Sequence, residues 1–257
     1  DYQEITPGFT LEEAIKEASR CLQCPEPACV STCRLGNDIP LAMWFVSRGD
    51  IKQAARVYRR TNPLPEICGR VCPPNDSCAA ECILGRQGRP IDTRAIEAFV
   101  ADFIRSSGEE LEIPKAPPTG KKVAVIGSGP SGLLVTEKVL LAGHDVVVYE
   151  ALPEPGGLLV YGIPGFKLEK RIVEHKVHWL EDMGAVFKTN KRIGKDISLD
   201  ELFEDEGFDA VYIGTGAQKI ATVGLEGEDL GQVYSSLDFI NAANLPEEAL
   251  PEDLHHL

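Results

Sequence analysis

The chain has 257 residues, of which 43% are hydrophobic and 26% charged, as in ordinary globular proteins. That length allows two domains, each with its own core. No apolar run approaches the roughly 18 residues that a membrane-spanning helix needs, and the formal net charge of −14 argues against nucleic acid as a partner. We therefore expect a cytoplasmic protein of two domains with no membrane insertion.

Residues 1–105 predict short helices joined by loops that carry cysteines. Helices are expected to begin near Thr10, Pro40, Asp50 and Thr93. The first has a capping box, in which a Thr hydroxyl and the Glu three residues later each accept a backbone amide. The last carries apolar residues at helical spacing as far as Ile104. Because no alternating strand pattern precedes residue 120, this domain is predicted to be all-α.

All eight cysteines of the chain fall in this region, in two groups. The groups are Cys21-x2-Cys24-x4-Cys29-x3-Cys33 and Cys68-x3-Cys72-x5-Cys78-x3-Cys82. Disulfides are typical of secreted domains, and a zinc ribbon usually pairs two C-x2-C knuckles, of which the second group has none. Closely spaced cysteines that hold two [4Fe–4S] clusters fit best, although the spacing is not that of a bacterial ferredoxin.

Basic residues also gather in the cysteine region, from Arg48 to Arg94. Such a stretch is often a solvated helix face. It is also suited to docking an acidic electron carrier, or to surrounding anionic clusters.

Residues 106–120, rich in proline and without periodicity, predict a linker to a second domain at 121–257. Strands are expected at Lys122–Ile126, Asp145–Glu150, Ala185–Lys188 and Ala210–Ile213. Helices are expected between them, to about Ala142, over Leu168–Asp182 and over Leu199–Glu204. This alternation predicts a mostly parallel, doubly wound sheet.

A G-x-G-x-x-G motif follows the first of these strands and begins the next helix, the context that a dinucleotide site requires. The motif is Gly127-Ser-Gly129-Pro130-Ser131-Gly132. Its glycines allow a tight turn, close approach of the backbone to a pyrophosphate, and close packing of helix on strand. Glu150, at the end of the second strand, is placed to accept hydrogen bonds from a ribose and disfavours NADP.

The motif alone does not separate FAD from NAD. Gly156-Gly157-Leu158 comes shortly after the second strand, where a flavin would extend. Two adjacent glycines let the backbone approach a bulky ring system, so the sequence favours FAD.

Together these residues resemble a known family. The cysteine groups, including Cys68-Gly-Arg-Val-Cys72-Pro, precede Val-Ala-Val-Ile-Gly-Ser-Gly-Pro-Ser-Gly and Gly-Gly-Leu-Leu-Val-Tyr-Gly-Ile-Pro164. This order resembles the small subunit of glutamate synthase. It is similar also to the large subunit of NADH-dependent ferredoxin:NADP oxidoreductase and to the N-terminal half of dihydropyrimidine dehydrogenase. The resemblance implies an α+β protein, with an all-α domain that holds two [4Fe–4S] clusters followed by a doubly wound α/β Rossmann-type domain that binds FAD.

The resemblance also implies interleaved metal ligands. One cluster would be held by Cys21, Cys24, Cys29 and Cys82, and the other by Cys33, Cys72, Cys78 and Glu97. Cys68 would then be a packing residue. From the residues alone, Glu97 would be an exposed helix acid.

Further contacts to the flavin follow from the same resemblance. Lys167 stands where the family has an Arg that contacts the flavin phosphates. Leu158 and Ile193 are also expected to contact the cofactor.

The family inserts a second Rossmann domain for NADPH after Ile213-Gly-Thr-Gly, and no second G-x-G-x-x-G occurs before Leu257. We therefore expect a fragment, or a chain whose partner completes it. The implied function is that of an electron-transfer subunit of an NAD(P)H-dependent oxidoreductase. It would pass electrons between flavin and clusters within a hetero-oligomeric complex, to another subunit or to a ferredoxin-like carrier. The alternative is a non-catalytic electron-wiring or scaffold module with no nicotinamide site of its own.

Overall fold

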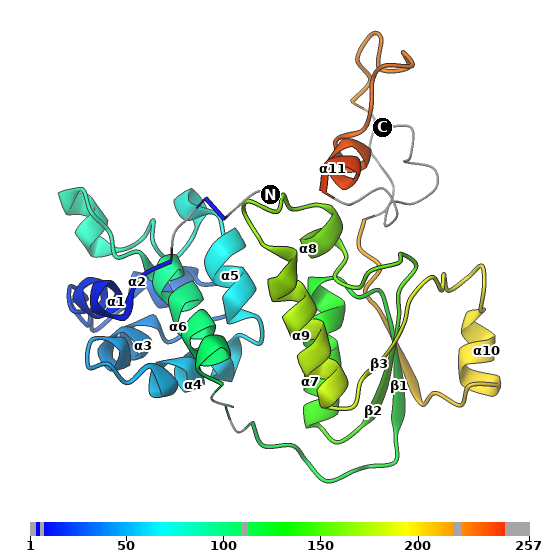
Figure 1. The fold of residues 1–257 in the computed structure, drawn as a ribbon, viewed down its shortest axis with the longest axis horizontal. Coiled ribbons are helices and arrows are strands. Elements are labelled where there is room, and N and C mark those ends of the chain that lie inside the picture. The colour runs from blue at the N-terminus through cyan, green and yellow to red at the C-terminus, as the bar shows by residue number, and fades with distance from the viewer. Residues whose placement is uncertain (1–3, 6–7, 109–110, 112, 218–222, 245–257) are drawn as a thin grey trace. The chain divides into compact units, whose positions relative to one another are not determined.

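The computed structural model describes residues 4–5, 8–108, 111, 113–217 and 223–244. The chain divides into two compact units, Glu4–Ile113 and a second that contains Pro114–Leu257. Figure 1 shows the helices of the first unit and the sheet of the second. Each unit is considered by itself below.

The described part of the first unit contains helices and loops and no strand. Its α-helices are α1 (Leu11–Ala18), α2 (Ala28–Thr32), α3 (Ile39–Val46), α4 (Ile51–Thr61), α5 (Pro65–Val71) and α6 (Thr93–Ser107), with 3₁₀ turns at Pro74–Asp76 and Ile83–Gln87. Helix α6 packs closely on α5 and α4, and α3 packs on α4. Buried side chains from these helices form one core, against which Cys21, Cys29, Cys33, Cys78 and Cys82 pack. The cysteine loops are therefore anchored on the core of the unit.

Capping explains where the longer helices begin. Thr10 and Glu13 form the expected capping box at α1. Asp38, Asp50 and Asp92 accept backbone amides at the starts of α3, α4 and α6. Helix α6 continues to Ser107, past the predicted end at Ile104. The sequence analysis missed α2 and α5, which are too short for an apolar periodicity to be visible.

The second unit has a parallel sheet of four described strands in the order β3-β2-β1-β4. These are β1 (Lys122–Ile126), β2 (Asp145–Tyr149), β3 (Val186–Lys188) and β4 (Ala210–Ile213). The helices are α7 (Pro130–Leu141), α8 (Leu158–Tyr161), α9 (Lys170–Asp182), α10 (Leu199–Glu204) and α11 (Ser236–Asn244). The predicted doubly wound arrangement is thus confirmed for the described strands.

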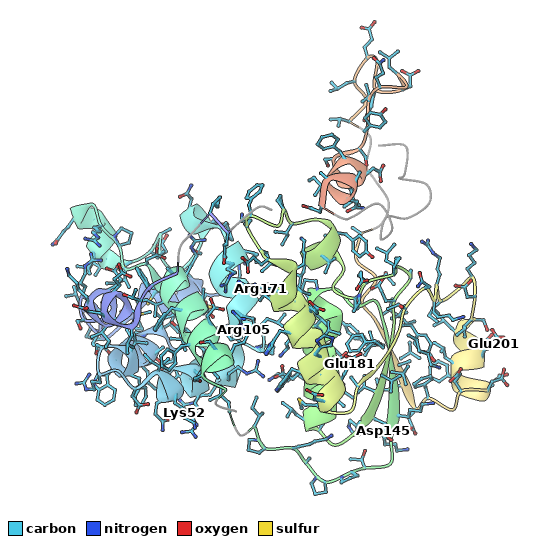
Figure 2. All side chains as sticks on the ribbon, in the orientation of Figure 1. Lys52, Arg105, Asp145, Arg171, Glu181 and Glu201 are labelled. Carbon is cyan, nitrogen blue, oxygen red and sulfur yellow. The ribbon has the colours of Figure 1, made fainter. Side chains whose placement is uncertain are left out.

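Helices cover both faces of this sheet (Figure 1). Helices α7 and α9 lie on one face, and a buried ion pair of 2.6 Å between Lys176 and Glu137 joins them. On the other face, Leu202 of α10 and Phe208 pack against Ala124 and Tyr149. Figure 2 marks the start of β2 at Asp145 and the exposed side of α10 at Glu201. No helix in the described ranges has the length and apolar character needed to cross a membrane.

Candidate cofactor sites

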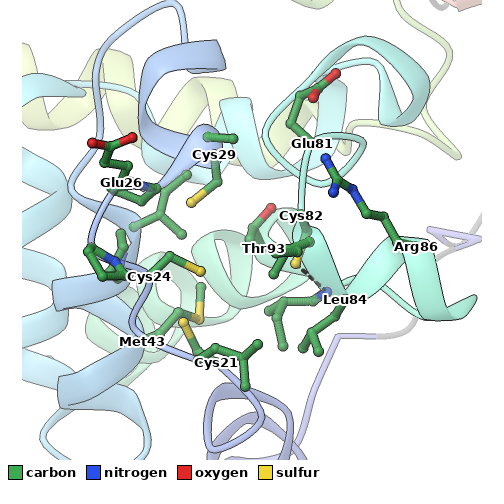
Figure 3. A pocket seen from close by; sticks show the side chains of 18 residues that line it. Cys21, Cys24, Glu26, Cys29, Met43, Glu81, Cys82, Leu84, Arg86 and Thr93 are labelled. Atoms are coloured by element: carbon green, nitrogen blue, oxygen red, sulfur yellow. Dashed lines mark hydrogen bonds between the residues drawn. The ribbon is translucent and has the colours of Figure 1, made fainter.

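A cavity of about 540 Å³ in the first unit is lined by four of the eight cysteines. They are Cys21, Cys24, Cys29 and Cys82, whose sulfur atoms face a common space in Figure 3. Three come from the first group in the sequence and one from the second. The fold therefore brings the two sequence groups together in one cavity.

Short helices and turns hold these four thiols in place. Cys29 lies within α2, and the amide of Cys21 extends the end of α1 by donating to the Ala18 carbonyl at 3.0 Å. Cys82 precedes a 3₁₀ turn, and its Sγ accepts the amide of Ile91 at 3.5 Å. Amides directed at sulfur are expected around a thiolate that carries negative charge.

The environment of this cavity opposes free thiolates. Burial, followed by the nearby thiols of Cys21, Cys78 and Cys82, raises the pKa of Cys29 to about 12. Burial also raises the pKa of Cys21. Bound iron would supply the positive charge that makes deprotonation of these thiols favourable.

A second set of groups lies around Cys78, which packs against the same core. The pKa of Cys78 is raised by burial, and by the nearby charges of Glu97, Cys33 and Cys72. The Sγ of Cys78 is 3.0 Å from the Thr93 hydroxyl at the start of α6. The structure therefore brings Cys33, Cys72, Cys78 and Glu97 into one neighbourhood.

Glu97 is buried, with 7% of its surface exposed, so the interpretation as an exposed helix acid was wrong. Its Oε1 accepts the side-chain amides of Asn37 at 2.9 Å and Asn62 at 2.7 Å. Neither amide bonds to Oε2. Burial raises the pKa of Glu97 to about 8, against the opposing effect of the two amides. One oxygen of the carboxylate is thus fixed, and the other accepts no hydrogen bond from a described residue.

The sequence analysis did not identify Asn37 and Asn62, because neither lies near Glu97 in the sequence. Asn62 follows the end of α4 and is fully buried. Its Oδ1 accepts the backbone amide of Leu64 at 2.9 Å and the thiol of Cys68 at 3.7 Å. A buried asparagine that bonds to both Glu97 and Cys68 would have been visible only from the tertiary structure.

Cys68 differs from the other cysteines in its contacts. It lies beside Cys72, and their hydrogen-bonding interaction is the main reason why the pKa of Cys72 falls to about 7. The same interaction, together with burial and the charge of Glu97, raises the pKa of Cys68 strongly. Cys68 therefore contacts both Cys72 and Asn62.

The spread of the donors allows a test of the metal hypotheses. No three Cys, His, Asp or Glu side chains in the described ranges approach closely enough to bind a single ion. A structural zinc site needs four donors within about 2.0–2.3 Å of one ion. In a [4Fe–4S] cluster the protein ligands bind to separate irons, so their sulfurs stand farther apart. Two sets of four dispersed donors therefore fit clusters better than zinc.

Gly127 and Gly129 of the nucleotide motif lie between β1 and α7, and Gly132 lies in the first turn of α7. Gly127 has φ +94°, and a Cβ there would be 2.6 Å from the Gly214 carbonyl oxygen. A Cβ on Gly132 would be 1.9 Å from the Gly127 oxygen. A Cβ on Gly129 would meet no atom within 4 Å. The fold itself thus requires Gly127 and Gly132, whereas Gly129 borders open space at the N-terminus of α7, as a phosphate site needs.

Glu150 joins this loop to the segment after β2. Its Oε2 accepts the Ser128 amide at 3.0 Å and the Ser128 hydroxyl, and its Oε1 accepts the Leu152 amide at 2.9 Å. The Ser128 hydroxyl in turn accepts the Gly156 amide at 2.9 Å. Gly157, with φ +54°, lies so close that a Cβ there would be 2.8 Å from the Gly129 Cα. The double glycine therefore borders the motif, as the FAD hypothesis expects.

The remaining residues predicted to contact the cofactor lie on different elements of the second unit and differ in exposure. Pro130 begins α7, and the Ser131 hydroxyl is bonded to the Tyr212 hydroxyl. Leu158 begins α8 and is 55% exposed, and Lys167 is exposed. Ile193 packs, partly buried, against the core on the α10 face of the sheet.

Lys170 is a nearby cation that the sequence analysis did not single out. Its Nζ donates to the Leu159 carbonyl at 3.2 Å and to the Ile163 carbonyl. Burial lowers its pKa to about 8. It thus ties α9 to the segment around α8.

Two known domain families match the chain. Residues 1–109 match dihydropyrimidine dehydrogenase domain II, 4Fe-4S cluster. Residues 125–192 match the NAD(P)-binding Rossmann-like domain. The prediction of a helical iron–sulfur domain followed by a Rossmann-type domain is confirmed.

Characterised relatives are similar to nearly the whole chain. It is 38% identical over 241 residues to the glutamate synthase [NADPH] small chain of Halomonas elongata, covering 94% of this chain and 51% of that protein. The small chain of Escherichia coli K12 is 38% identical over 242 residues, covering 94% and 51%. That of Bacillus subtilis is 39% identical over 253 residues, covering 95% and 50%. The chain thus spans about half the length of the curated relatives it matches.

Proposed function

From its similarity to glutamate synthase small chains, we propose that the chain is an FAD- and [4Fe–4S]-containing electron-transfer part of an NAD(P)H-dependent oxidoreductase. Its helical unit would hold two clusters, and its Rossmann-type unit would hold FAD. When bound, the flavin exchanges electron pairs for single electrons and the clusters carry single electrons.

The observation that carries this proposal is the cavity in which Cys82 joins Cys21, Cys24 and Cys29. It supports a first cluster with these four ligands. The neighbourhood of Cys78 supports a second, with Cys33, Cys72 and Cys78 as thiolate ligands. Glu97 would supply the fourth ligand through Oε2, held in place by Asn37 and Asn62 at Oε1. A carboxylate is a harder donor than a thiolate and would shift the potential of that cluster.

FAD is the dinucleotide we propose for the second unit. The approach of Gly157 to Gly129 supports a ligand that continues past the pyrophosphate along the segment after β2. The amides at the start of α7 would bind the pyrophosphate, and Glu150 would accept a ribose hydroxyl while also holding the loop. Lys167, exposed near α9, would reach the flavin phosphates as a point charge, and Leu158 and Ile193 would border the cofactor.

The partners are part of the proposal. A nicotinamide site would come from a further domain or from another subunit, and electrons would leave to another oxidoreductase subunit or a ferredoxin-like carrier. A cytoplasmic location remains our expectation, because cluster thiolates need a reducing compartment.

Cofactor analysis of anaerobically purified protein tests the function. We expect about eight iron and about eight sulfide per chain, with FAD released on denaturation. Cys24→Ser should remove about half of the iron and none of the FAD. Stoichiometric zinc without sulfide, or a nicotinamide in place of the flavin, would overturn the proposal.

A further inference from the structure

Two buried hydroxyls in the described part of the helical unit, those of Tyr58 and Ser77, have no hydrogen-bond partner. Tyr58 lies on α4 with 1% of its surface exposed, and its OH makes no hydrogen bond to any described residue. The buried guanidinium nitrogens that also lack a partner, on Arg94 and Arg105, belong to groups that donate through another nitrogen. Tyr58 has no other side-chain polar atom, so its hydroxyl needs an acceptor that the described residues do not provide.

The surroundings of this hydroxyl are the proposed cluster ligands. Burial raises the pKa of Tyr58 well above its usual value, and the charges of Glu97, Cys78, Cys29 and Cys33 raise it further. Helix α4 packs on α6, which carries Glu97. A phenol in such a place keeps its proton and can only be useful as a donor to a negatively charged acceptor.

We propose that the Tyr58 hydroxyl donates a hydrogen bond to a sulfur atom of the cluster held by Cys33, Cys72, Cys78 and Glu97, an inference that rests on the proposed function. Three of its four electrostatic neighbours, Glu97, Cys78 and Cys33, belong to that ligand set, and the remaining one, Cys29, belongs to the other. Tyr58 also belongs to the core against which Cys33, Cys78 and Cys29 pack.

The consequence is a higher reduction potential for this cluster. Hydrogen bonds to cluster sulfurs stabilise the reduced, more negative state. A donor that acts on one cluster and not the other sets the difference between their potentials. Tyr58 would thus bias the direction in which an electron moves between the two clusters.

Tyr58→Phe removes only the hydroxyl oxygen, and Tyr149→Phe is its matched control in the other unit, where the buried Tyr149 accepts a hydrogen bond from Lys188 at 3.4 Å. Iron and sulfide are measured first, then the potentials by EPR-monitored titration. In Tyr58→Phe we expect the iron and sulfide of wild type. At the wild-type midpoint the ratio of reduced to oxidised cluster should fall about three- to tenfold, where tenfold corresponds to about 59 mV. Tyr149→Phe should leave both potentials unchanged.

A second measurement needs no substitution. Wild-type protein is produced in cells supplied with tyrosine that is deuterated at the ring positions beside the hydroxyl. Pulsed EPR of the reduced protein should then detect a coupling between the cluster and this deuterium. If Tyr58→Phe loses its clusters, the deuterium measurement on the wild type tests the proposed hydrogen bond instead. Wild-type cluster content with no deuterium coupling, or with unchanged potentials in Tyr58→Phe, overturns this inference alone. Absence of iron and sulfide from the wild type overturns the proposed function, and this inference with it.

Discussion

The nucleotide loop of the second unit runs without interruption from Gly127 to Gly132, whereas the ligand sets that we propose for the first unit would be collected from positions between Cys21 and Glu97. The loop is a backbone site, because its shape depends on positive φ and on the absence of side chains. The cysteine sites are side-chain sites, and their geometry depends on how α2, α5 and α6 pack. A backbone site should lose its fold or its ligand when a side chain is added to one of its glycines. A side-chain site should tolerate any substitution that leaves its metal-binding side chains unchanged.

The largest effect is expected from Gly132→Ala. The new Cβ would lie 1.9 Å from the Gly127 oxygen, both atoms being fixed by β1 and α7. We expect the free energy of unfolding of this unit to fall by about 1–3 kcal/mol or more. The purified variant should retain no FAD. Thermal denaturation and the FAD content of the purified variant measure this.

Gly129→Ala is the matched variant in the same loop. Its Cβ meets no protein atom within 4 Å, so the melting temperature of the FAD-free protein should be unchanged. FAD should bind about tenfold more weakly, a loss of about 1.4 kcal/mol. If both variants lose the same stability, the distinction between fold glycine and ligand glycine is wrong.

The corresponding test of the side-chain site compares two cysteines. Cys78→Ser should lose about four of the expected eight irons, because the Cys78 thiolate would be a ligand. Cys68→Ser should keep them, since Cys68 lies beside Cys72 and Asn62 and would bind no iron. Equal iron loss in both variants would show that each sequence group builds its own cluster.

These contrasts explain which features were predictable from the sequence. Strands, capped helices and the glycine motif depend on neighbouring residues, so their positions followed from local patterns. The fold class and the two kinds of domain were predicted correctly. The burial of Glu97 and its amides from Asn37 and Asn62 depend on contacts between α6, the segment before α3 and the end of α4. Local patterns misjudged Glu97, and only the resemblance pointed to it.

Glu150 combines the two kinds of site and should show an intermediate effect. Glu150→Ala leaves the amides of Ser128 and Leu152 without their acceptor, which should cost about 1–3 kcal/mol in the FAD-free protein. FAD retention should weaken by a similar amount if the carboxylate also binds the ribose. Glu150→Gln keeps one acceptor oxygen, so it should lose less stability and less FAD retention than Glu150→Ala. Lower stability with full FAD occupancy would leave Glu150 a loop-supporting residue only.

The smallest effect concerns the thiols after the clusters are removed by chelation. Cys72, with a pKa of about 7, should be alkylated by iodoacetamide at a rate that rises up to about pH 7 and then levels off. Cys29, with a pKa of about 12, should react far more slowly at pH 8, and its rate should still rise with each further pH unit. Mass spectrometry of timed digests gives both rates.

Cys68→Ala is the control for this pH dependence. The hydrogen-bonding interaction with Cys68 is the main cause of the low pKa of Cys72, with the charge of Arg94 as a lesser one. Removing the Cys68 thiol should therefore move the rise in Cys72 alkylation to higher pH and leave the rate of Cys29 unchanged. A Cys72 profile that does not shift would mean that Arg94 alone stabilises the thiolate. Cys68 would then be an ordinary packing residue beside the second ligand set, as the resemblance first implied.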